Sequence, residues 1–157
     1  MEIKKEDSQP KNEDAAILLV EDDDVEAALT LEALRRYGAA ERVVRARDGK
    51  AALDFIFSGS GSTVRSPAPC LILLDLKLPK LDGLEFLRRL KSDAAANIIP
   101  IVVLSFSNLG NDILSSYRLG ANSYIVKPIN FGEFADAVGR LAAYWLELNR
   151  GASATVS

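Results

Sequence analysis

The sequence contains no histidine, which removes several kinds of catalytic and metal site. Serine–histidine–aspartate triads, His-ligated metals and phosphohistidine donors all require that side chain. Cys70 is the single cysteine, so no internal disulfide can form, as is typical of proteins in a reducing compartment. We therefore expect a cytoplasmic protein in which zinc is a poor candidate for any metal site.

Long apolar runs and strong charge are also missing. No run approaches the ~20 residues that a membrane span needs, and residues 1–14 lack the apolar core of a signal peptide. The net charge of −3 argues against binding to nucleic acid or to a membrane surface. We expect one domain at residues 15–150 with flexible tails at 1–14 and 151–157, and no output module after Arg150.

The most informative stretch runs from Pro69 to Gly83 and reads PCLILLDLKLPKLDG. Its short apolar run at residues 70–74 predicts a strand that is buried on both faces, as in a parallel sheet. The run ends at Asp75, and a carboxylate in that position is costly unless something there needs it. In open parallel sheets, ligands bind at the carboxyl ends of the strands.

Four other short runs of strand-forming residues alternate with helical patterns along the chain. The strands are expected at residues 16–20, 42–46, 70–74, 101–105 and 123–126, and the helices start near 24, 49, 83, 111 and 130. In the first helix, the spacing places Val25, Ala28, Leu31 and Leu34 on one shared face, and the last helix is expected to reach Asn149. This alternation predicts an α/β fold, a (βα)5 doubly wound domain with a five-stranded parallel sheet.

Polar residues stand at the expected carboxyl ends of four of these strands. Glu21 and Asp22 follow the first strand, Asp75 follows the third, Ser105 ends the fourth, and Lys127 follows the fifth. Because parallel strands open on one edge of the sheet, we expect these side chains to meet. Three carboxylates in one pocket need a cation, and a hard ion such as Mg²⁺, or Mn²⁺ as an alternative, suits them.

A carboxylate in such a pocket can act as a nucleophile toward phosphorus and form an aspartyl phosphate. The transferring phosphoryl group needs a metal, a second cation and a hydroxyl around its oxygens. Mg²⁺, Lys127 and Ser105 supply these three groups, so the pattern predicts a phosphate-accepting pocket with Asp75 as the acceptor.

In their order and spacing, these motifs resemble the receiver domain of two-component response regulators, the CheY-like family, over about residues 15–150. The residues that carry the resemblance are Glu21, Asp22, Asp75, Lys77, Pro79, Asp82, Gly83, Ser105, Tyr124, Lys127 and Pro128. It implies a flavodoxin-like sheet with strand order 2-1-3-4-5, and phosphoryl transfer from a sensor histidine kinase to Asp75. It also implies no enzymatic activity beyond the protein's own phosphorylation and slow dephosphorylation.

The resemblance assigns further roles around the acceptor. The metal is held by Asp22, Asp75 and the backbone carbonyl of Lys77, while Glu21 acts through a water or from behind the direct ligands. Lys127 and Ser105 stabilise the phosphoryl group, and Tyr124 forms a switch with Ser105. By contrast, Asp23, Asp24 and Asp82 are expected only to stabilise helix N-termini.

The C-terminal part, GANSYIVKPINF followed by a Tyr-Trp pair, is similar to small single-domain regulators that partner bacterial phytochrome histidine kinases. That similarity implies a homodimer through the last helix, with Tyr144, Trp145 and Leu148 at the seam. The implied partners are the sensor kinase and a second copy of the chain, with no nucleic acid and no membrane.

Two positions depart from the family pattern and leave the lifetime of the phosphorylated state open. Phe106 follows Ser105 where a small residue is more usual, and Lys77 places a cation two residues after Asp75. An aspartyl-nucleophile phosphatase would need an aspartate at the position of Lys77, which disfavours that class. A phosphorylation-independent docking or dimerisation module with a vestigial pocket, and a phosphorelay shuttle with the same site, stay open as alternatives.

Overall fold

The computed structural model describes residues 15–57 and 63–152, and within them five strands alternate with five α-helices. The strands are β1 (Ile17–Val20), β2 (Val43–Ala46), β3 (Leu71–Leu74), β4 (Ile101–Ser105) and β5 (Ser123–Val126). The α-helices are α1 (Asp24–Tyr37), α2 (Gly49–Ile56), α3 (Gly83–Ser92), α4 (Gly110–Arg118) and α5 (Phe131–Ala142). A 3₁₀ turn η3 (Ala40–Arg42) and a π-helical segment η4 (Ala143–Leu148) complete the order. Of the tails expected at 1–14 and 151–157, only residues 151 and 152 lie within the described residues.

The strands form one parallel sheet in the order β2-β1-β3-β4-β5, which confirms the doubly wound architecture. Ile17 pairs with Val43 on one side and with Leu71 on the other. The order therefore reverses between β1 and β3, and in such sheets a crevice opens outside the carboxyl ends at the point of reversal. No helix among residues 15–57 and 63–152 is long and apolar enough to cross a membrane.

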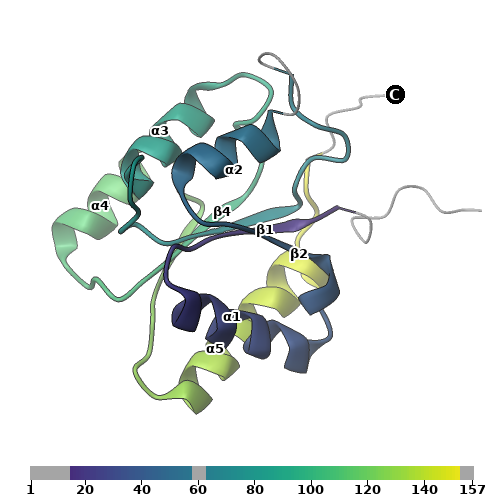
Figure 1. Ribbon diagram of the computed structural model, residues 1–157, viewed down its shortest axis with the longest axis vertical. Helices are drawn as coiled ribbons and strands as arrows, with labels where there is room; N and C mark the ends of the chain where they lie inside the picture. The colour runs from purple at the N-terminus through teal and green to yellow at the C-terminus, as the bar shows by residue number, and fades with distance from the viewer. Residues whose placement is uncertain (1–14, 58–62, 153–157) are drawn as a thin grey trace, which may run out of the picture.

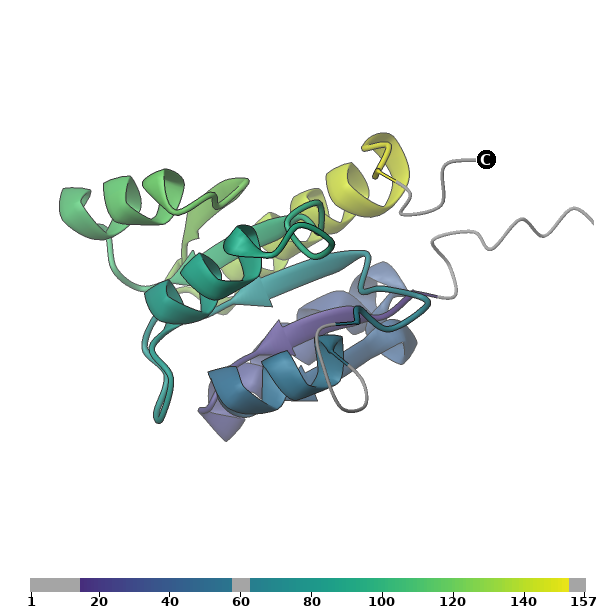
Figure 2. The same cartoon turned by 90° about the horizontal axis from the view of Figure 1, so that it is seen from above.

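Helices cover both faces of the sheet, and two apolar clusters fill the space beneath them (Figure 1). Helices α2, α3 and α4 lie along one face and α1 with α5 along the other, and Figure 2 shows the first layer in front of the strands. Along β3, Ile72 and Leu74 enter the first cluster, whereas Leu71 and Leu73 enter the second. This two-sided burial explains why the run at 70–74 carries no alternating polar residues.

The face predicted for α1 is wrong at Val25 and Ala28 and right at Leu34. Val25 is 68% exposed and Ala28 is exposed, while Leu31 is partly buried. The buried residues of this helix are Ala27, Thr30, Ala33 and Leu34. Helices α1 and α5 pack side by side (Figure 1), and small side chains allow this close approach. Packing against α5 therefore sets which face of α1 is buried, and small side chains make up most of that face.

The last helix was predicted to run unbroken to Asn149, but its winding changes after Ala142. Residues 143–148 form the wider π-helical turn, which the Asn149 N–H closes by donating to the Tyr144 carbonyl at 2.6 Å. Tyr144 and Leu148 are exposed, while Trp145 packs partly against the cluster between the sheet, α1 and α5.

Candidate functional site

The carboxyl edge of the sheet brings the polar residues that follow the strands together. The Glu21 N–H donates to the Ala46 carbonyl at 3.0 Å, and the Asp75 N–H donates to the Val20 carbonyl at 3.1 Å. These bonds extend the backbone ladder one residue beyond β1 and β3. As a result, carboxylate oxygens of Glu21, Asp22 and Asp75 all lie within 4.8 Å of one another. We call these three residues the acid cluster.

Lys127 reaches the acid cluster from the end of β5. Its backbone N–H donates to the Ser105 carbonyl at 2.7 Å, which fixes the chain at this point. Its Nζ lies 2.8 Å from Glu21 Oε1 and 3.8 Å from Asp75 Oδ2. The side chains of Lys127 and Glu21 are each 2% exposed. The structure therefore joins the predicted acceptor, acidic pair and lysine in one place.

The charges in this pocket are not balanced by the chain alone. Burial raises the pKa of the Glu21 carboxyl, and the neighbouring Asp75 adds to this rise, while contact with Lys127 opposes it. Burial acts to lower the pKa of Lys127, but the contacts with Glu21 and the charges of Asp75 and Glu26 raise it above its ordinary value. The carboxylates in this pocket thus outnumber the one ammonium group. This excess of negative charge favours the binding of an added cation. The donor oxygens suit Mg²⁺ or Mn²⁺, and the cluster has no nitrogen or sulfur ligand of the kind zinc prefers.

The loop after β3 fixes the orientation of Asp75. The Lys77 N–H donates to Asp75 Oδ1 at 3.2 Å, while the Lys77 side chain points into solvent. Gly83 holds this loop in place, because a Cβ there would lie 2.6 Å from the Cα of Leu76. Asp82 Oδ1 accepts from the Leu84 N–H at 3.2 Å, which agrees with the expectation that Asp82 caps a helix. The glycine of the predicted motif therefore serves close backbone packing directly behind the acceptor.

The predicted switch pair is connected through a third residue, Ser107. Ser105 is 1% exposed, and its Oγ accepts from the Ser107 N–H at 3.2 Å. The Tyr124 hydroxyl donates to the Ser107 carbonyl at 2.7 Å, and the Ser107 hydroxyl donates to a carboxylate oxygen of Asp112. The sequence pattern treated Ser107 as an ordinary loop hydroxyl. Only its spacing of two residues from Ser105 could have marked it.

Phe106 lies at the mouth of the pocket. Its side chain is 52% exposed, and its ring centroid lies 5.1 Å from the Nζ of Lys127. This distance is within the range at which an ammonium group is attracted to an aromatic face. The bulky residue that departs from the family pattern therefore contacts the lysine of the site.

The two aspartates that follow Asp22 stabilise local structure. Asp23 is the N-cap of α1, where its Oδ1 accepts from the Glu26 N–H at 2.9 Å. Asp24 Oδ1 lies 2.8 Å from a guanidinium nitrogen of Arg45 and 2.8 Å from one of Arg47. Asp23 thus caps α1 as expected, while Asp24 pairs with two arginines.

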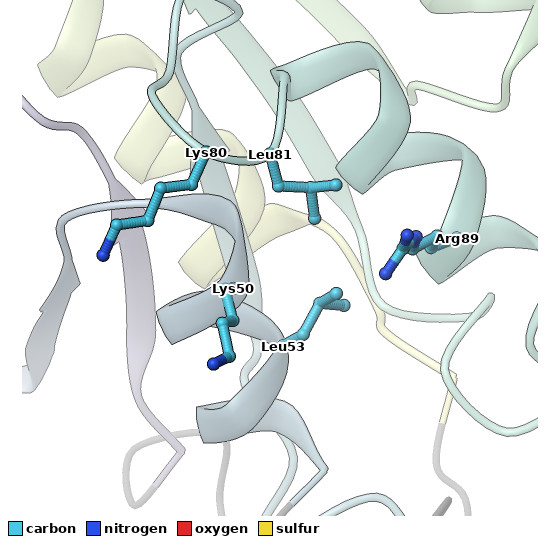
Figure 3. Close-up of a pocket in the computed structure, with 5 residues that line it drawn as sticks. All are labelled: Lys50, Leu53, Lys80, Leu81 and Arg89. Atoms are coloured by element: carbon cyan, nitrogen blue, oxygen red, sulfur yellow. The ribbon is translucent and has the colours of Figure 1, made fainter.

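A separate hollow of about 210 Å³ lies between α2 and α3 and contains none of the predicted site residues. Its lining residues are Lys50, Leu53, Lys80, Leu81 and Arg89 (Figure 3). Lys80 Nζ lies 3.6 Å from Asp48 Oδ2, and Arg89 Nε lies 3.2 Å from Glu85 Oε1. Figure 3 shows the Lys80 ammonium pointing away from the two leucines. Two of the three cations that line this hollow, Lys80 and Arg89, already contact carboxylates of the chain, so they are less available to a ligand. The acid cluster therefore remains the candidate functional site.

Most of the chain is similar in sequence to known proteins. Residues 17–139 match the family described as Response regulator receiver domain. A probable methanogenesis regulatory protein, FilR2 of Methanothrix harundinacea, is 40% identical over 136 residues, 85% of this chain and 85% of that protein. Response regulator Rcp1 of Synechocystis is 38% identical over 140 residues, 89% of this chain and 95% of Rcp1.

Solved structures of similar proteins have the same fold. The phosphorylated cyanobacterial phytochrome response regulator RcpA superposes with a TM-score of 0.80 at 38% identity, over 88% of this chain and 99% of that one. The Mn²⁺-bound form of Rcp1 gives 0.77 at 36% identity, over 88% and 99%. The bacteriophytochrome response regulator AtBRR gives 0.66 at 43% identity, over 87% and 98%.

Proposed function

The chain belongs to the response regulator receiver family, and from this premise we propose that its acid cluster accepts a phosphoryl group on Asp75. The donor is the phosphohistidine of a sensor histidine kinase, of the bacteriophytochrome type. Receiver domains are signalling proteins, and we assign this one no catalysis beyond its own phosphorylation and slow dephosphorylation. The observation that carries the proposal is the meeting of Asp75, the acidic pair and a buried lysine at one edge of the sheet.

The contacts of Asp75 distinguish its two oxygens. Oδ1 accepts the Lys77 N–H, whereas Oδ2 lies on the side of Lys127, so we assign the attack on phosphorus to Oδ2. A new Oδ2–phosphorus bond forms as the phosphorus–nitrogen bond of the donor breaks, and the departing imidazole takes up a proton. Lys127 and the Ser105 hydroxyl then stabilise the charge on the phosphoryl oxygens.

Asp22, Asp75 and the backbone carbonyl of Lys77 would hold a divalent metal, with Glu21 acting through a water or from behind the direct ligands. Receiver domains bind divalent metal, and the solved Rcp1 contains Mn²⁺. We propose Mg²⁺ for this chain, with Mn²⁺ as the alternative. The ion would supply positive charge next to the carboxylates and the phosphoryl oxygens.

Phosphorylation of Asp75 would affect Tyr124 through the hydrogen bonds of Ser107. When the Ser105 hydroxyl turns toward the phosphoryl oxygens, the Ser107 N–H loses its acceptor. The Tyr124 hydroxyl, which is bonded to the Ser107 carbonyl, then has to follow or find a new partner. Such a shift changes the relative populations of two packings of β4, α4 and β5, which a partner can distinguish.

We also propose a homodimer through η4, with Tyr144, Trp145 and Leu148 at the seam. Tyr144 is 50% exposed and Leu148 is 73% exposed, and the Tyr144 and Trp145 rings meet edge to face at 5.0 Å. Burying these side chains against a second copy removes apolar surface from water. Sedimentation equilibrium should show the dimer for the natural chain and a monomer for Leu148→Arg.

We assign the protein to the cytoplasm, where a single unpaired cysteine stays reduced.

The central test is incorporation of phosphate from acetyl phosphate in the presence of Mg²⁺. Asp75→Asn should abolish incorporation, because a neutral amide lacks the nucleophilic, negatively charged oxygen of the carboxylate. Asp82→Asn is the matched control, since Asp82 lies in the same loop but only caps α3, and it should keep full incorporation. Labelling that persists in Asp75→Asn would show that the acceptor is another residue. Transfer profiling against purified histidine kinases, with bacteriophytochrome kinases included, would identify the natural donor.

The docking module with a vestigial pocket is not favoured by the family membership, and it makes a different prediction. Such a module would show no affinity for Mg²⁺ and no change when beryllofluoride, a phosphoryl mimic, is added. A functional receiver should bind both Mg²⁺ and beryllofluoride. Its ¹H–¹⁵N spectra should then change at Ser107 and Tyr124 and at their neighbours.

A further inference from the structure

The ammonium group of Lys127 faces a third carboxylate, that of Glu26, which is not one of the predicted site residues. Glu26 Oε2 lies 3.5 Å from Lys127 Nζ, closer than Asp75 Oδ2 at 3.8 Å. Lys127 is 2% exposed, whereas Glu26 is 24% exposed. The lysine has three N–H donors, and in this state the two glutamates are its nearest acceptors.

The usual reason for a glutamate at this position does not hold here. Asp23 and Glu26 have the spacing of a capping box, in which the glutamate would accept from the N–H of the N-cap residue. The Asp23 side chain does accept from the Glu26 N–H at 2.9 Å, but the Asp23 N–H points to Glu21 Oε2 at 3.4 Å. The carboxylate of Glu26 is directed instead to Lys127. The first turn of α1 therefore aims an acidic side chain at the lysine of the site.

We propose that Glu26 is a positioning residue, which holds Lys127 in the resting state and competes with the phosphoryl group for it. The inference rests on the proposed function, because it assumes that Lys127 moves to a phosphoryl group on Asp75. To reach that group the ammonium has to give up a present partner. Glu21 is buried and would be left uncompensated, whereas Glu26 is partly exposed and can be rehydrated. Glu26 is therefore the partner that is released.

Three variants separate this contact from a general effect of charge. Glu26→Gln keeps the shape and the capping ability of the side chain but removes its charge. Glu26→Asp keeps the charge but shortens the reach by one methylene, about 1.3 Å. Asp24→Asn removes a charge from the same helical turn, at a residue that contacts Arg45 and Arg47.

Beryllofluoride titrations in saturating Mg²⁺ measure the competition. We expect Glu26→Gln and Glu26→Asp to lower the half-saturating concentration about threefold to fivefold, the size expected for a partly exposed ion pair. Asp24→Asn should stay within about twofold of the natural chain. Unchanged or weaker binding in Glu26→Gln would overturn the inference. It would also be overturned if Glu26→Asp behaved as the natural chain does, because the effect would then come from charge alone.

A second measurement tests the contact without any phosphoryl mimic. In ¹H–¹⁵N spectra of lysine ammonium groups, the buried Lys127 should give a protected signal that shifts or broadens in Glu26→Gln and Glu26→Asp. If the natural chain failed to bind beryllofluoride at all, the proposed function would fail. The ammonium signal would then still decide whether Glu26 holds Lys127.

Discussion

Two lysines at opposite edges of the sheet have contrasting surroundings. At the carboxyl edge, Lys127 lies among carboxylates, and its pKa is raised despite its burial. At the amino edge, Lys91 Nζ donates to the carbonyls of Asn97 and Ile99 and to Asn122 Oδ1, each at 3.0 Å. These acceptors are neutral, and burial lowers the pKa of Lys91.

The difference shows how one residue type serves either the fold or the site. The Lys91 ammonium ties the end of α3 to the residues that begin β4 and β5, and its three donors are matched by three acceptors. Asn122 Oδ1 also accepts from the Ile101 N–H at 2.9 Å, so the amino edge forms a closed network. At the carboxyl edge the carboxylates outnumber the cation. That imbalance favours the binding of a metal ion.

The largest effects are expected when each of the two lysines is replaced by methionine. Lys127→Met should slow phosphate incorporation from acetyl phosphate about a hundredfold, because a preorganised charge is lost where negative charge develops. Lys91→Met should lower the free energy of unfolding by about 2 kcal/mol, because three acceptors lose a charged donor. Incorporation kinetics and urea unfolding, measured on both variants, check the two effects.

Lys91→Met is the control for the loss of incorporation in Lys127→Met, and the natural chain is the reference for both variants. Lys91→Met should keep its incorporation rate within about twofold of the natural value. If Lys91→Met slowed incorporation as much as Lys127→Met did, the two edges would not be functionally separate.

Substituting one glycine at each end of the strands should separate the two edges again, with a smaller effect. A Cβ at Gly83 would lie 2.6 Å from Leu76 Cα, while one at Gly120 would lie 2.8 Å from the Lys91 side chain at a φ of +106°. We expect Gly83→Ala and Gly120→Ala each to lower the free energy of unfolding by about 1–3 kcal/mol. Only Gly83→Ala should also weaken Mg²⁺ binding, because its loop carries Asp75. Equal loss of Mg²⁺ affinity in both variants would contradict this division.

Phe106 allows a finer test at the carboxyl edge. Because its ring lies over Lys127 at the pocket mouth, Phe106→Ala should admit water and shorten the lifetime of the phosphorylated state about twofold to fivefold. The decay of label after removal of acetyl phosphate measures this lifetime. Leu109→Ala is the control, since Leu109 is a 64% exposed apolar residue of the same loop and should leave the decay unchanged.

The smallest expected effect is a dependence of stability on pH at the amino edge. The pKa of Lys91 is lowered from 10.5, so between the folded value and 10.5 the unfolded chain binds more protons than the folded one. The contribution of Lys91 to stability should therefore rise as the pH rises through this window. The difference in unfolding free energy between the natural chain and Lys91→Met, measured from pH 7 to pH 10.5, should increase. A decrease would mean that the environment of Lys91 favours its charged form.

Much of this architecture could be predicted because β1, β3 and β4 are buried on both faces. Their apolar runs stop where the chain leaves the core, so the first polar residues after them, Glu21 and Asp75, had to share an edge of the sheet. Lys127 was found in the same way, since it directly follows β5.

What could not be predicted depends on contacts between distant elements. The phase of α1 follows from close packing against α5, which the position of Val25 in the sequence does not reveal. Glu26 was hidden because its spacing from Asp23 is also that of a capping box. Ser107 was hidden because its role comes from a hydrogen bond with Tyr124, which lies 17 residues away in the chain.

The π-helical segment at residues 143–148 has a consequence for how this family member can vary. A π turn accommodates more residues than the α-helical turn it replaces, so it is where a one-residue insertion can be absorbed without disturbing the helix before it. Deleting Ala143 would let the winding return to α geometry, and because the π turn holds one residue more than the α turn, the later side chains would keep about their present directions. A length change of a single residue at this point can thus be taken up within the turn while the carboxyl edge of the sheet stays intact.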